Sequence, residues 1–71
     1  MMTFRAIIDR WPTVAAFAAE VGEKYPTVAA WRQRDSIPPR RWNAVVQAAH
    51  ARGFTDVTFE TLASAAARTA A

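Results

Sequence analysis

The stretch VAAFAAEVGEKYPTVAAWRQ, residues 14–33, decides the fold of this 71-residue chain. Phe17 and Val21 lie four residues apart, so they share one face of an expected helix. Gly22 stands where this helix must end, because glycine readily adopts the positive φ that helix C-termini often need. The spacing therefore predicts a first helix that closes in a tight turn.

A second short helix is expected directly after this turn. Val28 and Trp31, three residues apart, give it an apolar face that packs back on the first helix. Pro26 suits its first turn, where the missing N–H costs little, and Asp35 with the prolines that follow it ends the helix. Residues 14–34 are therefore predicted to form a helix-turn-helix.

Three further helices are predicted around this pair, because apolar residues recur at helical spacing. The helix at about residues 3–10 has the apolar stripe Phe4, Ile7, Ile8 and Trp11. The helix at about 39–52 has Trp42, Val45, Val46 and Ala49 in the same spacing. The helix at about 59–67 has Phe59, Leu62, Ala63 and Ala66. Thr13 and Thr58 are expected N-caps, and Gly53 an expected helix end. All three tryptophans fall on apolar faces, so we expect core packing rather than base stacking. The prediction is one all-α domain of five short helices over residues 1–67, with a frayed tail at 68–71.

The basic residues are concentrated in one part of the chain. Residues 24–41 carry five basic side chains against one acidic one, a net charge of +4. Residues 1–23 have a net charge of −1, and residues 42–71 are balanced. Clustered positive charge is the electrostatic footprint of a DNA-binding surface, although it can also be a solvated basic face. The charge pattern favours DNA binding by the second helix and the segment after it.

The composition argues against several other classes of protein. The absence of cysteine excludes disulfides and thiolate metal sites. His50 is the only histidine, and two separate glycines cannot form a phosphate-binding loop. No apolar run reaches the ~18 residues of a membrane span. We therefore expect no enzyme, no cofactor, no metal, no membrane association, no small-molecule effector and a cytoplasmic location.

Residues 14–33 resemble the helix-turn-helix of Cro and phage-repressor-type regulators, which usually have an apolar residue in place of Glu23. The run WRQRDSIPPRRWNAVV…GFTDVTFETLA resembles the carph-isopro group of small phage and bacterial regulators. The residues that carry this second resemblance are Trp31, Arg34, Ile37, Pro38, Trp42 and Leu62. Together the resemblances cover about residues 4–63. They imply a lambda-repressor-like fold and sequence-specific binding of double-stranded DNA.

The outward face of the second helix is the expected surface for base contacts. At about 100° per residue, this face is opposite the inward Val28 and Trp31. The candidate base contacts are Lys24, Tyr25, Pro26, Thr27, Ala29, Ala30 and Gln33. Small alanines permit close approach to base edges, and Gln33 can pair with adenine N6 and N7. The alanines are alternatively helix formers on a solvated face, and Tyr25 alternatively contacts a phosphate or covers the core edge.

Four arginines are the candidate phosphate contacts: Arg32, Arg34, Arg40 and Arg41. The last two are expected in the first turn of the helix at 39–52, where backbone N–H groups and the helix dipole favour an anion. Arg32 could instead pair with Asp35 or Glu20. Arg34 could instead pair with an acidic neighbour. Phosphate contacts fix the register of a protein on DNA but carry little sequence information.

These features predict a transcriptional regulator, specifically a repressor that blocks polymerase, with its own promoter as a candidate target. A single short helix reads only a few base pairs, so we expect a homodimer on a palindromic operator. The expected dimer surface is the last helix with residues 54–62. The alternative is a protein-interaction module, such as an antitoxin or adaptor. Structured RNA is a weaker candidate, because side chains cannot read its deep, narrow major groove.

Overall fold

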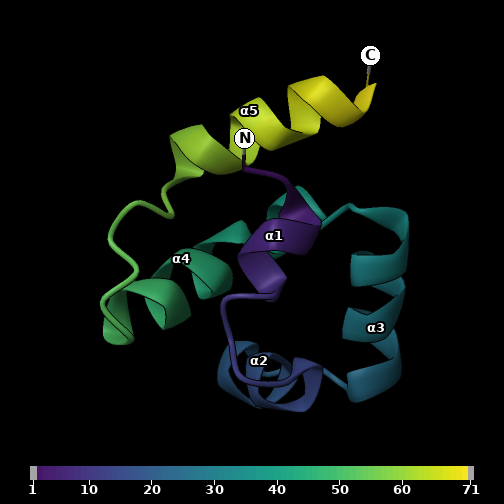
Figure 1. Cartoon of the computed structure of the whole chain (residues 1–71), viewed down its shortest axis with the longest axis vertical. Helices are drawn as coiled ribbons and strands as arrows, with labels where there is room; N and C mark the ends of the chain where they lie inside the picture. Colours follow the sequence, from purple (N-terminus) through teal and green to yellow (C-terminus); the bar gives the residue numbers. More distant parts are fainter. Residues whose placement is uncertain (1, 71) are drawn as a thin grey trace.

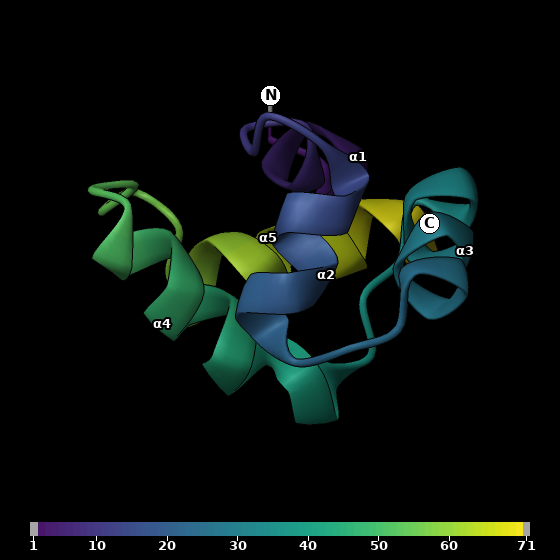
Figure 2. The ribbon, with the colours of Figure 1, turned by 90° about the horizontal axis from the view of Figure 1, so that it is seen from below.

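The computed structural model describes residues 2–70, and side chains as far as residue 68. Its elements are α1 (Phe4–Ile8), α2 (Val14–Val21), α3 (Tyr25–Arg34), the 3-10 turn η1 (Pro39–Arg41), α4 (Trp42–Ala51) and α5 (Phe59–Ala70). In the view of Figure 1, α1 lies near the centre, with α5 above it, α3 to its right and α2 below, and the perpendicular view shows that α1 lies at one edge of the molecule (Figures 1 and 2). The prediction of an all-α domain of five short helices is confirmed for the described residues. The predicted tail at 68–71 falls in the last turn of α5, apart from residue 71, which lies outside them.

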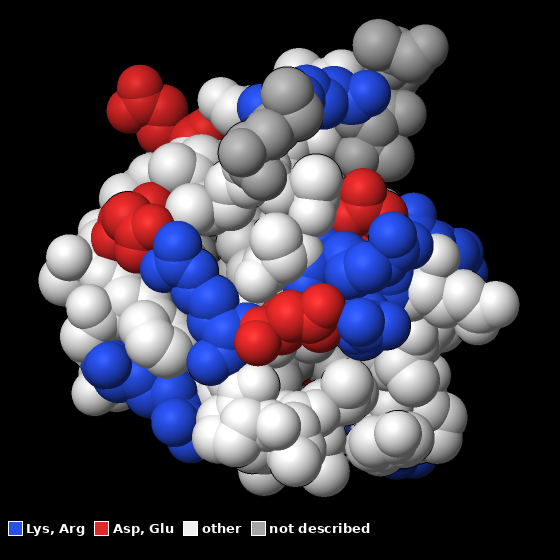
Figure 3. Space-filling model, viewed as in Figure 1, with Lys and Arg blue, Asp and Glu red and all other residues white. Residues whose placement is uncertain are grey.

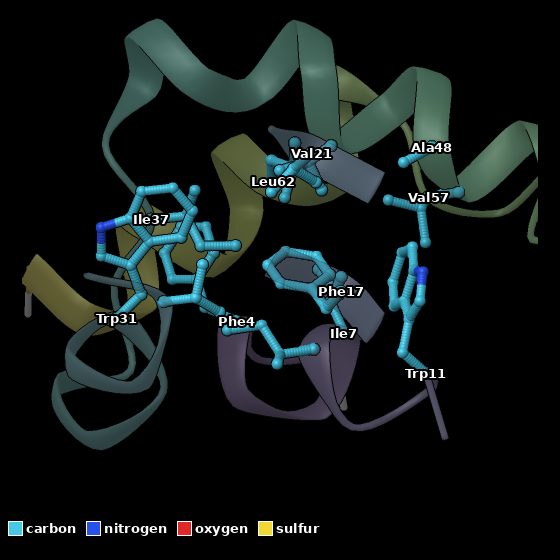
Figure 4. Close-up of a cluster of buried hydrophobic side chains, with 14 of the residues drawn as sticks. Phe4, Ile7, Trp11, Phe17, Val21, Trp31, Ile37, Ala48, Val57 and Leu62 are labelled. Atoms are coloured by element: carbon cyan, nitrogen blue, oxygen red, sulfur yellow. The ribbon is translucent and has the colours of Figure 1, made fainter. Parts of the chain in front are cut away.

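One hydrophobic core joins all five helices. Its largest fully buried side chains are Phe4, Phe17, Ile7, Ile8, Ile37, Leu62, Val28, Val45 and Val57. The rings of Phe17 and Trp11 (Figure 4) pack edge to face at a centroid distance of 4.7 Å. The rings of Phe54 and Trp11 pack in the same geometry at 5.2 Å. Trp11 and Trp31 are buried, while Trp42 is partly buried against the core. The predicted core positions of the three tryptophans are confirmed.

Local hydrogen bonds explain where the helices begin and end. The hydroxyls of Thr3 and Thr13 each accept a backbone N–H three residues later, at 3.0 Å, as N-caps of α1 and α2. Thr58 accepts in the same way at 3.2 Å before α5. Gly22 ends α2 with φ 75°, and Asp35 ends α3 with φ 53°. The predicted caps and the predicted end of α2 are confirmed.

Arg5 and Asp35 fasten α1 to the C-terminal end of α3. The backbone N–H of Arg5 donates to Asp35 Oδ1 at 2.8 Å. In return, the Arg5 guanidinium donates to the backbone carbonyls of Arg32 and Gln33, each at 3.1 Å. These carbonyls belong to the last turn of α3, where the i+4 partners of a continuing helix are missing, and the Arg32 carbonyl also accepts from the backbone N–H of Asp35 at 3.2 Å. A cation there also interacts favourably with the helix dipole, so this contact fixes the position of α3.

The helix predicted at 39–52 begins differently from expectation. Arg40 and Arg41 lie in the 3-10 turn η1, and the α-helix starts only at Trp42. The physical reason is the proline pair, because Pro38 is held extended by the ring that follows it and Pro39 has no N–H. The two arginines therefore precede α4 rather than belonging to its first turn.

The residues of α5 that face the core also differ from the predicted apolar stripe. Leu62 and Ala65 are buried, whereas Phe59 is 51% exposed and Ala63 is exposed. Val57, in the loop before the helix, is fully buried, and its carbonyl oxygen lies 2.9 Å from His50 Nε2 of α4. The prediction that Phe59 and Ala63 face the core is therefore wrong, because α5 is fully buried only along the narrow stripe of Leu62 and Ala65.

Glu20 links α2 to the residue that follows α4 and to the loop between α1 and α2. Its carboxylate accepts hydrogen bonds from Arg52 Nε at 2.8 Å and from the indole Nε1 of Trp11 at 2.9 Å. Both donors favour the ionised carboxylate. The hydrogen bond from Arg52, followed by that from Trp11, lowers the pKa of Glu20 from 4.5 to about 2.

We expect acid to destabilise the fold partly through Glu20. The unfolded state takes up a proton near pH 4.5 and the folded state only near pH 2. The stabilisation is therefore complete above pH 4.5 and is lost as the pH falls towards 2. The urea midpoint should decrease over this range, and Glu20→Gln should remove part of the decrease. Glu60→Gln is the control, since Glu60 makes no ion pair with any described residue. An unchanged pH dependence in Glu20→Gln would contradict this assignment.

Candidate nucleic-acid interface

The helix α3 buries one face and presents the other to solvent. Val28 and Trp31 are 0% and 3% exposed and pack into the core. The seven candidate base contacts all reach the surface: Lys24, Tyr25, Pro26, Thr27 and Gln33 are exposed, and Ala29 and Ala30 are half-buried. α3 lies at one edge of the molecule in two perpendicular views (Figures 1 and 2). The predicted outward face of this helix is therefore available to a large partner.

A hollow of about 530 Å³ lies against this face. Its lining residues are Arg5, Val14, Tyr25, Ala29, Arg32 and Gln33. It brings together three candidate base contacts and one candidate phosphate contact. It also adds Arg5 and Val14, which sequence reasoning did not assign to the site. The remaining base candidates, Lys24, Pro26, Thr27 and Ala30, lie outside the lining of the hollow.

The four candidate phosphate arginines differ in whether a carboxylate is paired with them. Arg34 and Arg40 are exposed, and neither forms an ion pair with any residue in the described part of the chain. Arg41 is paired with Glu23, in the turn between α2 and α3, and its Nε atom is buried without a hydrogen-bond partner. Glu23, the departure from the Cro-like pattern, therefore joins this turn to η1.

Arg32 is held by Asp9, at the C-terminal end of α1. Its Nε donates to Asp9 Oδ1 at 2.7 Å and its Nη2 to Oδ2 at 2.9 Å, a bidentate pair. The expected alternative partners were wrong, because Asp35 accepts from the backbone of α1 and Glu20 is held by Arg52. No signal in the sequence indicates the true pair, because its members lie 23 positions apart and meet only through the packing of α1 on α3.

The surface around α3 therefore carries less net positive charge than the charge count over residues 24–41 indicates. Of the five basic residues in 24–41, Arg32 and Arg41 are neutralised by carboxylates from the acidic segment 1–23. Near the centre of the view, acidic atoms lie directly between two groups of basic atoms (Figure 3). The hydrogen bonds from Arg32 hold the pKa of Asp9 below its usual range, because they favour the ionised carboxylate.

Neither a metal site nor a membrane-spanning helix is evident among the residues that the structure describes. Among them no group of three or more His, Cys, Asp or Glu side chains could hold a metal ion. None of the described helices has the length and apolarity needed to cross a bilayer. His50 Nε2 lies 2.9 Å from the Val57 carbonyl oxygen, so its ring links α4 to the loop before α5. Comparisons with protein-family models, with curated proteins and with solved structures found no match.

Proposed function

We propose that this protein is a sequence-specific regulator that binds double-stranded DNA through α3. The observation that supports this most is the outward face of α3, where Ala29 and Ala30 leave room for close approach beside the exposed Gln33. The major groove of B-DNA admits an α-helix, but only small side chains let its axis approach the base edges. The Gln33 amide is then placed to pair bidentately with an adenine.

The remaining contacts in this proposal are with phosphates. Arg34 and Arg40 are exposed and carry charges that no described carboxylate neutralises. α2 and α3, joined through the left-handed Gly22, support a helix-turn-helix interpretation in which α3 is the recognition helix. Phosphate contacts at the end of α3 and in η1 would fix how far α3 enters the groove.

We further propose a repressor that acts as a homodimer on a palindromic operator. One short helix reads only a few base pairs, and two copies on half-sites about one helical turn apart supply the missing specificity. The half-exposed Phe59 lies in the segment 54–62 that we assign to the dimer surface. Occupancy of the operator would then block polymerase, with the promoter of the protein's own gene as the first candidate.

The test is fluorescence-anisotropy binding to the DNA upstream of the protein's own gene, beside a scrambled duplex, at ~50 and ~200 mM salt. Tighter binding to the upstream fragment at both salt concentrations would support a specific regulator. Equal binding that fades with salt would indicate a non-specific basic surface or a different operator. The absence of binding at both concentrations would contradict the proposal and favour the protein-interaction alternative.

Two alanine variants separate base contacts from phosphate contacts. Gln33→Ala should cost ~1–3 kcal/mol on the cognate site and relax the preference at one base position. Arg40→Ala should weaken cognate and scrambled DNA to the same extent and reduce the salt slope by about 1. Binding to both duplexes at several salt concentrations distinguishes these outcomes. If both variants lost affinity equally on all sequences, Gln33 would not be a base contact.

A further inference from the structure

The pair of Asp9 and Arg32 lies at the edge of the candidate DNA surface. Arg32 lines the hollow on α3 together with Tyr25, Ala29 and Gln33. The side chains of Arg32 and Asp9 are 41% and 45% exposed, so the pair lies at the surface and a phosphate can reach it. A DNA backbone that runs along the edge of this hollow therefore meets a guanidinium whose donors Nε and Nη2 are already bound to a carboxylate.

We infer that Asp9 is a competitor for DNA phosphates, which lowers the affinity of this surface for DNA of any sequence by occupying Arg32. This inference rests on the proposed DNA binding by α3. To bind Arg32, a DNA phosphate must either displace the Asp9 carboxylate or lie beside its negative charge. Both reduce the favourable free energy that counterion release gives to DNA binding. Sequence-dependent contacts from α3 are unaffected, because Asp9 lies on α1 and does not line the hollow.

The role assigned to Asp9 also has a structural basis in α1. Arg5, in the same short helix, holds the last turn of α3 through the carbonyls of Arg32 and Gln33. Arg5 of α1 therefore holds the backbone of Arg32, and Asp9, at the C-terminal end of α1, holds the Arg32 guanidinium. Because the Arg5 hydrogen bonds do not involve Asp9, removal of the Asp9 charge should release the Arg32 side chain without moving α3.

Asp56→Asn provides a matched control for Asp9→Asn. Asp56 forms a bidentate pair with Arg10, with distances of 2.6 and 2.5 Å. Its replacement thus removes the same charge and also frees one arginine. The loop that carries Asp56, between α4 and α5, lies on the side of the molecule away from α3 in both views (Figures 1 and 2). The two variants differ mainly in whether the released arginine lies beside α3.

The experiment measures binding to the upstream and scrambled duplexes from ~50 to ~200 mM salt for wild type and both variants. Asp9→Asn should tighten binding to both duplexes about three- to tenfold at the lowest salt and steepen the salt slope by about 0.9, the value of one added phosphate contact. Asp56→Asn should leave the slope unchanged. Arg32→Gln should change the slope little in the wild type and should cancel the gain in the Asp9→Asn background.

Equal slopes for Asp9→Asn and Asp56→Asn, with DNA binding intact in the wild type, would overturn the role of Asp9 and leave the proposed function standing. A loss of affinity in Asp9→Asn would overturn it too, provided that circular dichroism shows the variant folded. An Asp9→Ser variant repeats the test if the asparagine variant is unfolded. A wild-type protein that binds neither duplex would overturn both the proposed function and this inference.

Discussion

Replacement of Phe17 by alanine should remove about half of the free energy of unfolding of this domain at 25 °C. The Phe17 side chain is 0% exposed and meets Trp11 edge to face at 4.7 Å in the centre of the core. Truncation of a buried phenylalanine costs about 3–5 kcal/mol, from lost burial and from the cavity that remains. A domain of this size has only about 4–11 kcal/mol of stability in total. Urea unfolding followed by circular dichroism should therefore show a large decrease in the midpoint.

Phe59→Ala is the matched control for this prediction. The same atoms are removed from a side chain that is 51% exposed, so at protein concentrations at which the chain is a monomer the loss should be less than about 1 kcal/mol. Similar urea midpoints for the two variants would contradict the placement of Phe17 at the centre of the core. They would also contradict the exposed position of Phe59 at the start of α5.

The features of this fold that could be predicted from the sequence are those determined by residues a few positions apart in the chain. Thr13 caps α2 through an N–H three residues away, and Gly22 ends the same helix because of its own φ. Val28 and Trp31 are buried as their spacing predicts. Each of these outcomes depends on a backbone preference or on the period of one helix, and both can be read from a short window of sequence.

The charges of the site could not be predicted in the same way. Arg32 pairs with Asp9 and Arg41 with Glu23, and in each case the partner was fixed by the packing of separate elements. A charge count over 24–41 predicts a uniformly basic surface, whereas the folded chain brings acidic groups from 1–23 onto it. Long-range pairs of this kind depend on which helices meet, and an exposed ion pair contributes too little energy to decide that.

Introduction of a negative charge on the outward face of α3 should abolish DNA binding while the fold remains intact. In Ala29→Glu, the new carboxylate would stand in the hollow beside Tyr25 and Gln33. It would meet base edges and phosphates at the point where the helix must come closest to DNA. Steric exclusion and like-charge repulsion together should reduce the affinity on the order of 100-fold, which corresponds to about 2.8 kcal/mol. Fluorescence anisotropy with the upstream duplex at low salt measures this loss.

Ala19→Glu makes the same chemical change on α2, at an exposed position that does not line the hollow. Both variants reduce the net charge of +3 to +2. A general electrostatic effect would therefore weaken both alike, whereas a groove-facing α3 predicts a severe loss for Ala29→Glu alone. Circular dichroism should show both variants folded, because neither site is part of the buried core, and the urea midpoint should decrease more for Ala29→Glu, since Ala29 is half-buried and Ala19 is exposed. If Ala29→Glu bound the upstream DNA as well as Ala19→Glu, α3 would not enter the groove through this face. The arginines of η1 would then have to bind DNA in a different orientation, in which the sequence of the site is not read by Gln33.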